Sequence, residues 1–268
     1  MHPIEKKFSQ LREKREKALV SYMMTGYPDF ESSLKAFRIL LEGGTDILEI
    51  GCPFSDPVAD GPAIQEAHEI ALKKGTGISH VLRLSQSLRK EFPDVPFLLM
   101  TYYNPVYRIG LERFSSMIAE SGINGVIVPD LPAEEVDELK SVLKDKGLSL
   151  VLLASPTTTE ERMRMICRKT DHMTYYVSIT GTTGARKSLP LEEIESHVKQ
   201  YRGICSKPVV VGFGVSKKEH VEEISSFADG VVVGSLFVRM AGKGMFEELS
   251  EKVRELKEGT RMAQPTTS

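Results

Sequence analysis

Short apolar runs alternate with longer amphipathic segments along most of this chain. The apolar runs lie at 18–25, 47–51, 96–102, 125–129, 149–154, 174–179, 208–213 and 230–234. Between them, apolar positions recur at helical spacing near 30–41, 63–74, 78–91, 111–121, 133–146, 159–169, 190–201 and 217–226. Such runs are typical of buried strands and such segments of surface helices, so the pattern predicts repeated strand–helix units and a parallel sheet.

Eight strand–helix units in 268 residues fit a closed barrel better than an open sheet. We therefore expect an α/β protein with a single (β/α)8 TIM barrel over residues 1–258. Ile4, Phe8 and Leu11 add a short N-terminal helix before the first strand. From Gly259 the apolar period is lost, and 259–268 is expected to be a disordered tail.

Local helix-start signals support this frame. Asp29 is placed to cap the helix that follows the first strand. The pairs Ser216/Glu219 and Thr158/Glu161 have the spacing of capping boxes. Loops that precede such helix starts lie at the carboxyl ends of the strands, where barrel enzymes build their active sites.

Composition limits which partners the protein can bind and which cellular compartment it is expected in. The net charge of -2 gives no argument for nucleic acid or a membrane surface, and no apolar run reaches about 18 residues. Residues 1–17 are too polar for a signal peptide. Cys52, Cys167 and Cys205 are widely spaced and suggest neither a zinc site nor a disulfide framework. A cytoplasmic protein that binds neither nucleic acid nor membranes is expected.

Two carboxylates frame the most informative stretch, residues 46–62. Glu49 lies near the end of the second predicted strand, on the same face as Ile47. Burial there would raise its pKa toward a range useful for acid–base work, although a strand-end Glu bonded to backbone amides is the alternative. Asp60 follows on a loop stiffened by prolines. Together, the two acids favour catalysis.

Glycine-bearing turns follow the last three predicted strands. Gly214 follows the seventh strand, and Gly234 and Ser235 follow the eighth, where barrels commonly bind phosphate. The alternative is that these turns need glycine for geometry alone. The loop after the sixth strand, with Thr183 and Gly184, is either a lid or a plain connector. As a lid, it brings the Gly184 amide near the same phosphate.

The residues that Schiff-base and metal-dependent catalysis require are not found at suitable positions in this sequence. Lys169 and Lys207 precede strands rather than follow them, so no lysine is placed for Schiff-base chemistry. Four of the six histidines fall in helical segments, one precedes a strand and one is at the N-terminus, so they do not cluster as metal ligands. The sequence thus favours acid–base catalysis by Glu49 and Asp60 on a phosphorylated substrate, with no metal and no cofactor.

Several motifs together resemble the tryptophan synthase alpha subunit family. They are LEIGCPFSDPVADGPAIQ (48–65), YYNPV (102–106), VPDLP (128–132), YYVSITGTTGAR (175–186), GFGVS (212–216) and VVGS (232–235). The resemblance covers the whole barrel in order and spacing. It implies a lyase of tryptophan biosynthesis that cleaves indole-3-glycerol phosphate to indole and glyceraldehyde 3-phosphate. It also implies an alpha2beta2 complex in which indole is channelled to a beta subunit.

The resemblance assigns a role to individual residues. Glu49 would shuttle the proton, Asp60 would bind the indole N–H, and Tyr175 would be the active-site tyrosine. Thr183 would be the lid residue that bonds Asp60 when the lid closes. The remaining matches are phosphate-binding Gly184, Gly214, Gly234 and Ser235; indole-pocket Tyr22, Ile64, Met100 and Tyr102; and beta-subunit contacts Asp56, Pro57, Asn104 and Pro132. The apolar pocket positions could equally be core, and the contact positions ordinary loop residues.

Two other functions are alternatives for such a barrel. One is another phosphate-binding barrel, such as a sugar-phosphate isomerase, but the 48–65 segment does not resemble those enzymes. The other is a non-enzymatic barrel that only activates a beta partner. The presence of both Glu49 and Asp60 counts against it.

Overall fold

Eight parallel strands of the computed structural model close into one barrel in which each strand pairs with the next and the last pairs with the first. The structure describes residues 1–178, 191–212 and 214–261. The predicted (β/α)8 barrel is therefore confirmed. The strands are β1 (Ala18–Met24), β2 (Ile47–Gly51), β3 (Phe97–Met100), β4 (Gly125–Ile127), β5 (Ser149–Ala154), β6 (Thr174–Val177), β7 (Val209–Gly212) and β8 (Gly230–Val233).

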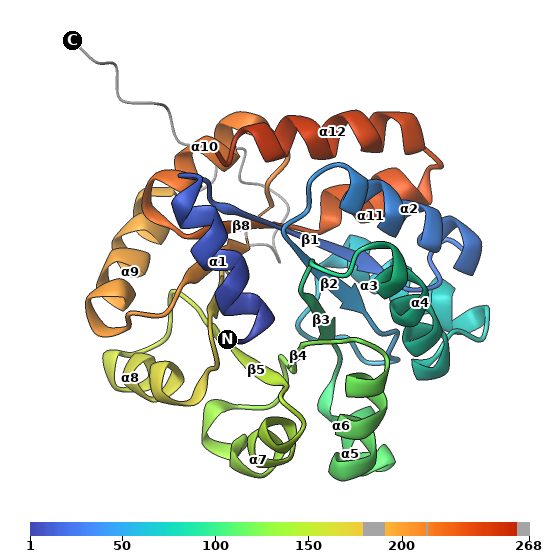
Figure 1. Ribbon diagram of the computed structural model, residues 1–268, viewed down its shortest axis with the longest axis horizontal. Helices are drawn as coiled ribbons and strands as arrows, with labels where there is room; N and C mark the ends of the chain where they lie inside the picture. The colour runs from blue at the N-terminus through green and yellow to red at the C-terminus, as the bar shows by residue number, and fades with distance from the viewer. Residues whose placement is uncertain (179–190, 213, 262–268) are drawn as a thin grey trace.

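Helices surround the barrel on all sides (Figure 1). Each amphipathic segment predicted from the sequence forms a helix. The predicted segment 133–146 divides into the 3-10 turn η1 and the helix α7, α5 was not expected, and the chain after β8 forms two helices. The helices are α1 (Pro3–Glu13), α2 (Phe30–Glu42), α3 (Pro62–Lys73), α4 (Ile78–Glu91), α5 (Tyr103–Ile109), α6 (Leu111–Glu120), η1 (Ala133–Glu135), α7 (Asp137–Asp145), α8 (Glu160–Lys169), α9 (Leu191–Ile204), α10 (Lys218–Phe227), α11 (Ser235–Gly242) and α12 (Phe246–Glu258).

Helix starts differ in detail from the expected caps. The Asp29 cap is confirmed, since its Oδ1 accepts the Ser32 amide at 2.8 Å. Both capping boxes are wrong. The N-cap of α8 is Thr159, because the Thr158 hydroxyl already accepts the Ser155 amide in the preceding turn. The N-cap of α10 is Lys217, without a side-chain bond.

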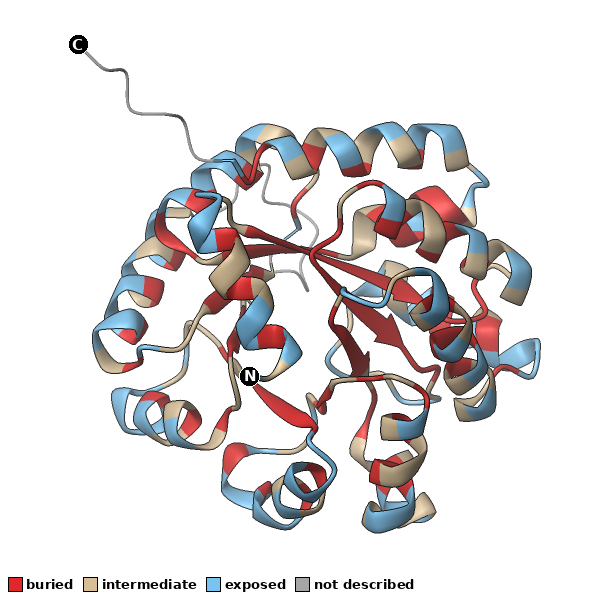
Figure 2. Cartoon of the chain, viewed as in Figure 1, coloured by how far each residue is buried: buried red, intermediate tan, exposed pale blue. Residues whose placement is uncertain are grey.

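The core has two layers, because alternate strand residues point inward and outward. Outward side chains pack under the helices, and the strands are buried almost throughout (Figure 2). Inward side chains fill the barrel, among them Val20, Ile47 and Leu98. Ile4 and Phe8 of α1 join this inner cluster. The N-terminal helix therefore closes the end of the barrel at which the strands begin, the end away from the expected site.

Two structural expectations are corrected. Residues 259–261 are packed rather than frayed: Thr260 is buried, and its carbonyl accepts the Lys17 amide at 2.8 Å. Residues 262–268 lie outside the described residues. Cys167 and Cys205 form a disulfide that the cysteine spacing did not suggest, because the fold brings the end of α8 beside the segment before β7.

No helix in the described ranges is long and apolar enough to cross a membrane.

Candidate active site

Glu49 lies inside the barrel near the end of β2. The strand register places it opposite Tyr22 of β1 and Leu98 of β3, and its alternation partner Ile47 belongs to the inner cluster. The residue is 1% exposed, and its Oε2 has no hydrogen-bond partner among the described residues. Burial, and secondly repulsion from Asp60, raises the pKa of this carboxyl to about 8. Glu49 is thus held mainly as the neutral acid at pH 7.

Asp60 lies on the loop between β2 and α3, and its side chain is only 5% exposed. Its Oδ2 accepts hydrogen bonds from the Tyr102 hydroxyl at 2.7 Å and from the His68 ring Nε2 at 3.0 Å. These two donors stabilise a carboxylate in a nearly dry position. The Asp60 carboxylate therefore shares the site with Glu49, and repulsion between the two groups contributes to the raised pKa of Glu49.

Tyr22 and Tyr175 complete this group. Burial holds the pKa of both phenols well above the usual range, and the nearby Glu49 and Asp60 add to the effect. Both phenols stay protonated and can only act as neutral hydrogen-bond partners at physiological pH. Each ring lies against a strand glycine: Tyr22 against Gly51, and Tyr175 against Gly212 at 2.8 Å from the position of an added Cβ. Any side chain at those glycines would occupy the space of the rings.

The four positions expected to line the indole pocket differ in how closely they approach the acidic pair. Tyr22 and Tyr102 both reach the acidic pair, and the Tyr102 ring stacks on Phe54 with centroids 5.1 Å apart. Met100 lies beside Gly51 in the strand register. Ile64 is half-buried in the first turn of α3 and packs against the main core.

Three of the expected phosphate positions are described. Gly214 follows β7 with a φ of 40°, in the left-handed region that favours glycine. Gly234 is the N-cap of α11, and Ser235 is its first residue. The N-cap glycine has no side chain to bond the first amides of this helix, and no other described side chain accepts them, so they suit an anion. Thr183 and Gly184 lie outside the described residues.

The expected partner-contact positions share one end of the barrel. Asp56, Asn104 and Pro132 are exposed, and Pro57 is half-buried. They lie on the segments that follow β2, β3 and β4, at the same end as the acidic pair. On these segments Val58 is 79% exposed and Tyr107 69% exposed, which leaves large apolar surface in solvent.

His68 was not expected at the site, because an isolated histidine in a helical segment did not suggest a metal ligand. The residue is 2% exposed, and its ring is hydrogen-bonded to Asp60. A signal was present: His68 falls on the apolar face of α3 with Ala67 and Ala71. A histidine on a buried helix face directly after an acidic loop needs a polar partner.

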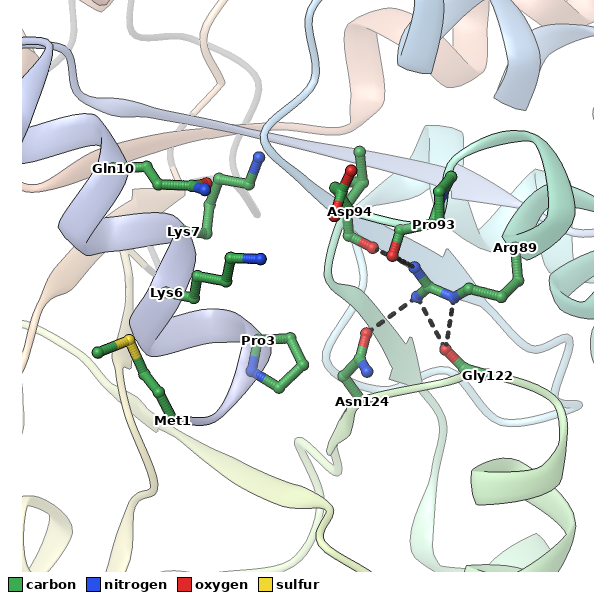
Figure 3. Close-up of a pocket in the computed structure, with 11 residues that line it drawn as sticks. Met1, Pro3, Lys6, Lys7, Gln10, Arg89, Pro93, Asp94, Gly122 and Asn124 are labelled. Carbon is green, nitrogen blue, oxygen red and sulfur yellow. Dashed lines mark hydrogen bonds between the residues drawn. The ribbon is translucent and has the colours of Figure 1, made fainter.

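A separate hollow of about 450 Å³ lies at the opposite end of the barrel, beside α1 (Figure 3). Lys6 and Lys7 reach into it from one side, and Arg89 forms part of the other. The Arg89 guanidinium is already saturated by the carbonyls of Gly122 and Val95 and by Oδ1 of Asn124. This end of a barrel serves stability rather than catalysis.

The described residues contain no group of three or more His, Cys, Asp or Glu side chains that could hold a metal ion. The chemical features of the site are therefore the neutral Glu49, the ionised Asp60, the buried phenols and an uncapped helix start. Such a site can move a proton, stabilise positive charge next to Asp60 and bind an anion.

Comparison with known proteins identifies the relatives of this chain. The family model described as "Tryptophan synthase alpha chain" matches residues 8–267. A tryptophan synthase alpha chain from Aquifex aeolicus is 64% identical over 97% of this chain and 100% of the relative. A solved Aquifex aeolicus structure has a TM-score of 0.92 at 61% identity, covering 98% and 100% of the two chains. Tryptophan synthase subunit alpha from Legionella pneumophila has a TM-score of 0.90 at 33% identity, covering 97% and 98%.

Proposed function

This chain belongs to the tryptophan synthase alpha chain family, and from that premise we propose that Glu49 and Asp60 carry the chemistry of its reaction. The reaction is the cleavage of indole-3-glycerol phosphate to indole and glyceraldehyde 3-phosphate, a lyase step of tryptophan biosynthesis. The observation that supports these roles is the buried Oε2 of Glu49, which no described residue hydrogen-bonds, in a site that also holds the Asp60 carboxyl.

Glu49 begins the cycle as a proton donor. With a pKa of about 8 it carries its proton at neutral pH, so it can protonate C3 of the indole ring. The ring then becomes a cation that can accept electrons. The resulting Glu49 carboxylate takes the hydroxyl proton from the side-chain carbon attached to C3. The C–C bond breaks, its electron pair returns to the ring, and the aldehyde forms.

Asp60 stabilises the cation that the first proton transfer creates. The positive charge is shared with the indole nitrogen, whose N–H can donate to a fixed carboxylate. Because Asp60 is nearly buried, its interaction with this charge is only weakly screened by water. The phenol of Tyr175 borders the same group and orients the substrate as a neutral hydrogen-bond partner.

The phosphate of the substrate binds at the start of α11. The free amides there, beginning at Ser235, and the close backbone approach allowed by Gly214 and Gly234 suit a phosphate dianion. Gly184 and Thr183, expected at the phosphate site and in the lid, lie outside the described residues. Tyr22, Ile64, Met100 and Tyr102 border the indole ring. This remote binding of the phosphate holds the indole end in place for proton transfer.

A beta subunit of tryptophan synthase is the proposed partner, in an alpha2beta2 complex in the cytoplasm. The exposed Asp56, Asn104 and Pro132, together with the apolar Val58 and Tyr107, lie around the site that releases indole. A partner at this face can receive indole directly. Tyr107→Glu should weaken binding of the beta subunit at least tenfold in titration calorimetry, and unchanged binding would place the interface elsewhere.

The catalytic proposal is tested by indole release from indole-3-glycerol phosphate. Glu49→Gln and Asp60→Asn each keep the shape and lose the acid or the charge, and each should lower kcat by about 100-fold or more. Substrate binding to the Gln variant, measured directly, should stay within about threefold because the phosphate contacts remain. Glu112→Gln, on the exposed face of α6, is the matched control. A kcat within about tenfold of wild type for Glu49→Gln would show that its role is misassigned.

A further inference from the structure

Asp60 is held by a two-armed arrangement of side chains. One arm is the Tyr102 hydroxyl and the other is the His68 ring, and both donate to the same oxygen, Oδ2, at 2.7 Å and 3.0 Å. No described residue donates to the other oxygen, Oδ1. The carboxylate therefore has one oxygen bound to the protein and one left for a further donor.

The hydrogen bonds of His68 determine where its ring proton lies. The Phe54 backbone N–H lies 2.9 Å from the ring Nδ1. A backbone N–H can only donate, so Nδ1 is the acceptor and the proton is on Nε2, facing Asp60. The bond from Phe54 is incompatible with a proton on Nδ1, so His68 is a neutral imidazole that donates through Nε2.

The hydrogen bonds of Tyr102 also determine where its proton lies. Its hydroxyl oxygen accepts the Ala59 backbone N–H at 3.2 Å, which leaves its own proton directed to Asp60. Each arm thus joins a backbone amide of the loop 52–61 to Oδ2. The two rings also meet edge to face, with centroids 6.1 Å apart. The loop and the carboxylate are positioned together.

We infer that His68 is a positioning residue for the cleavage reaction: it holds Asp60 so that Oδ1, and not Oδ2, faces the indole N–H. This inference rests on the proposed role of Asp60. The charge on the indole nitrogen appears only after protonation of C3. A carboxylate turned away from that nitrogen would therefore lower the rate of the chemical step. Substrate affinity, dominated by the phosphate, should change little.

Two substitutions separate the two bonds of His68. Asn has an oxygen near the position of Nδ1 and can accept the Phe54 amide, but it is too short to reach Asp60. Gln carries an amide group near the position of Nε2 and can donate to Asp60. His68→Asn should lower kcat for indole release about tenfold or more with KM within about threefold. His68→Gln should recover kcat to within about threefold of wild type.

The controls distinguish the possible failures. His197→Asn, on the outer face of α9, should leave kcat and KM unchanged. If Asp60→Asn keeps its turnover, the proposed role of Asp60 fails. If Asp60→Asn loses turnover but His68→Asn stays within about twofold of wild type, only the role of His68 is overturned. An equal loss of kcat in His68→Asn and His68→Gln also overturns it, because the donated bond would then not matter.

A second measurement does not depend on any variant folding. Nitrogen NMR of the wild-type protein should show a protonated Nε2 and an unprotonated Nδ1 for His68 at neutral pH. The opposite tautomer, or a doubly protonated ring, would overturn the inference even if the substitutions lower activity.

Discussion

The hydroxyl oxygen of Tyr22 lies so close to the point where a side chain at Gly51 would begin that even a methyl group there would collide with it. Tyr22 is in β1 and Gly51 ends β2, two residues after Glu49 on the same inward face. The aromatic ring therefore reaches the acidic pair only because position 51 has no side chain. This close approach connects the strand-end glycine to the geometry of the catalytic group.

Replacing this glycine should displace the ring. Gly51→Ala puts a methyl group against the buried Tyr22, which has little room to move. We expect kcat/KM to fall at least tenfold and stability to fall by about 1–3 kcal/mol. Gly203→Ala is the control, because its Cβ meets nothing within 4 Å, and helix propensity predicts a gain of up to about 1 kcal/mol. Unchanged kcat/KM in Gly51→Ala would contradict the close packing.

Glu49 should make the stability of the protein depend on pH. Its folded pKa of about 8 lies above its ordinary 4.5, so the folded state binds the extra proton. The stability it contributes is fully present below pH 4.5 and is lost as pH rises through 8. Relative to Glu49→Gln, the wild type should lose roughly 2–4 kcal/mol between pH 5 and 9. Urea unfolding at several pH values measures this, and parallel curves for the two proteins would refute it.

A negative charge at the start of α11 should oppose phosphate binding. Gly234→Asp sets a carboxylate beside the free amides, and Coulomb repulsion should weaken substrate binding roughly tenfold or more. Gly234→Ala separates charge from size, because its Cβ would meet Tyr22 only at ordinary contact distances from 3.4 Å. The Ala variant should lose far less affinity. Equal affinities for wild type and Gly234→Asp, measured by calorimetry, would exclude this phosphate site.

The disulfide between Cys167 and Cys205 should contribute to stability rather than to catalysis. It joins residues 38 apart in the chain, and closing such a loop is worth about 2–4 kcal/mol in the chain-entropy model. The Cys167→Ser/Cys205→Ser double variant should lose about this much unfolding free energy and keep its kcat for indole release. A reducing agent should lower the stability of the wild type to that of the double variant. No difference between the oxidised wild type and the double variant would contradict this contribution.

Strand and helix positions followed from the sequence because each depends on local patterning. β2 and β5 have the predicted ends, since a short apolar run between turn residues has few alternatives in a covered parallel sheet. The capping boxes failed because an adjacent residue takes the N-cap position: Thr159 caps α8, although the residue three positions later is Arg162 rather than Glu or Gln. Only the turn made by Ser155 decides between Thr158 and Thr159.

The pattern of residues along the chain was enough to predict the barrel and to place Glu49, Asp60 and the glycine turns at the carboxyl ends of their strands. Period-two and helical patterns specify which face a residue occupies, and parallel connections bring all strand ends to one side. Which side chains meet became known only from the folded barrel. The pairing of Asp60 with His68 and Tyr102, and of Cys167 with Cys205, depends on distances of a few ångströms between separate elements. Such distances are set by the packing of the whole barrel, and the local pattern of apolar and polar residues does not predict them.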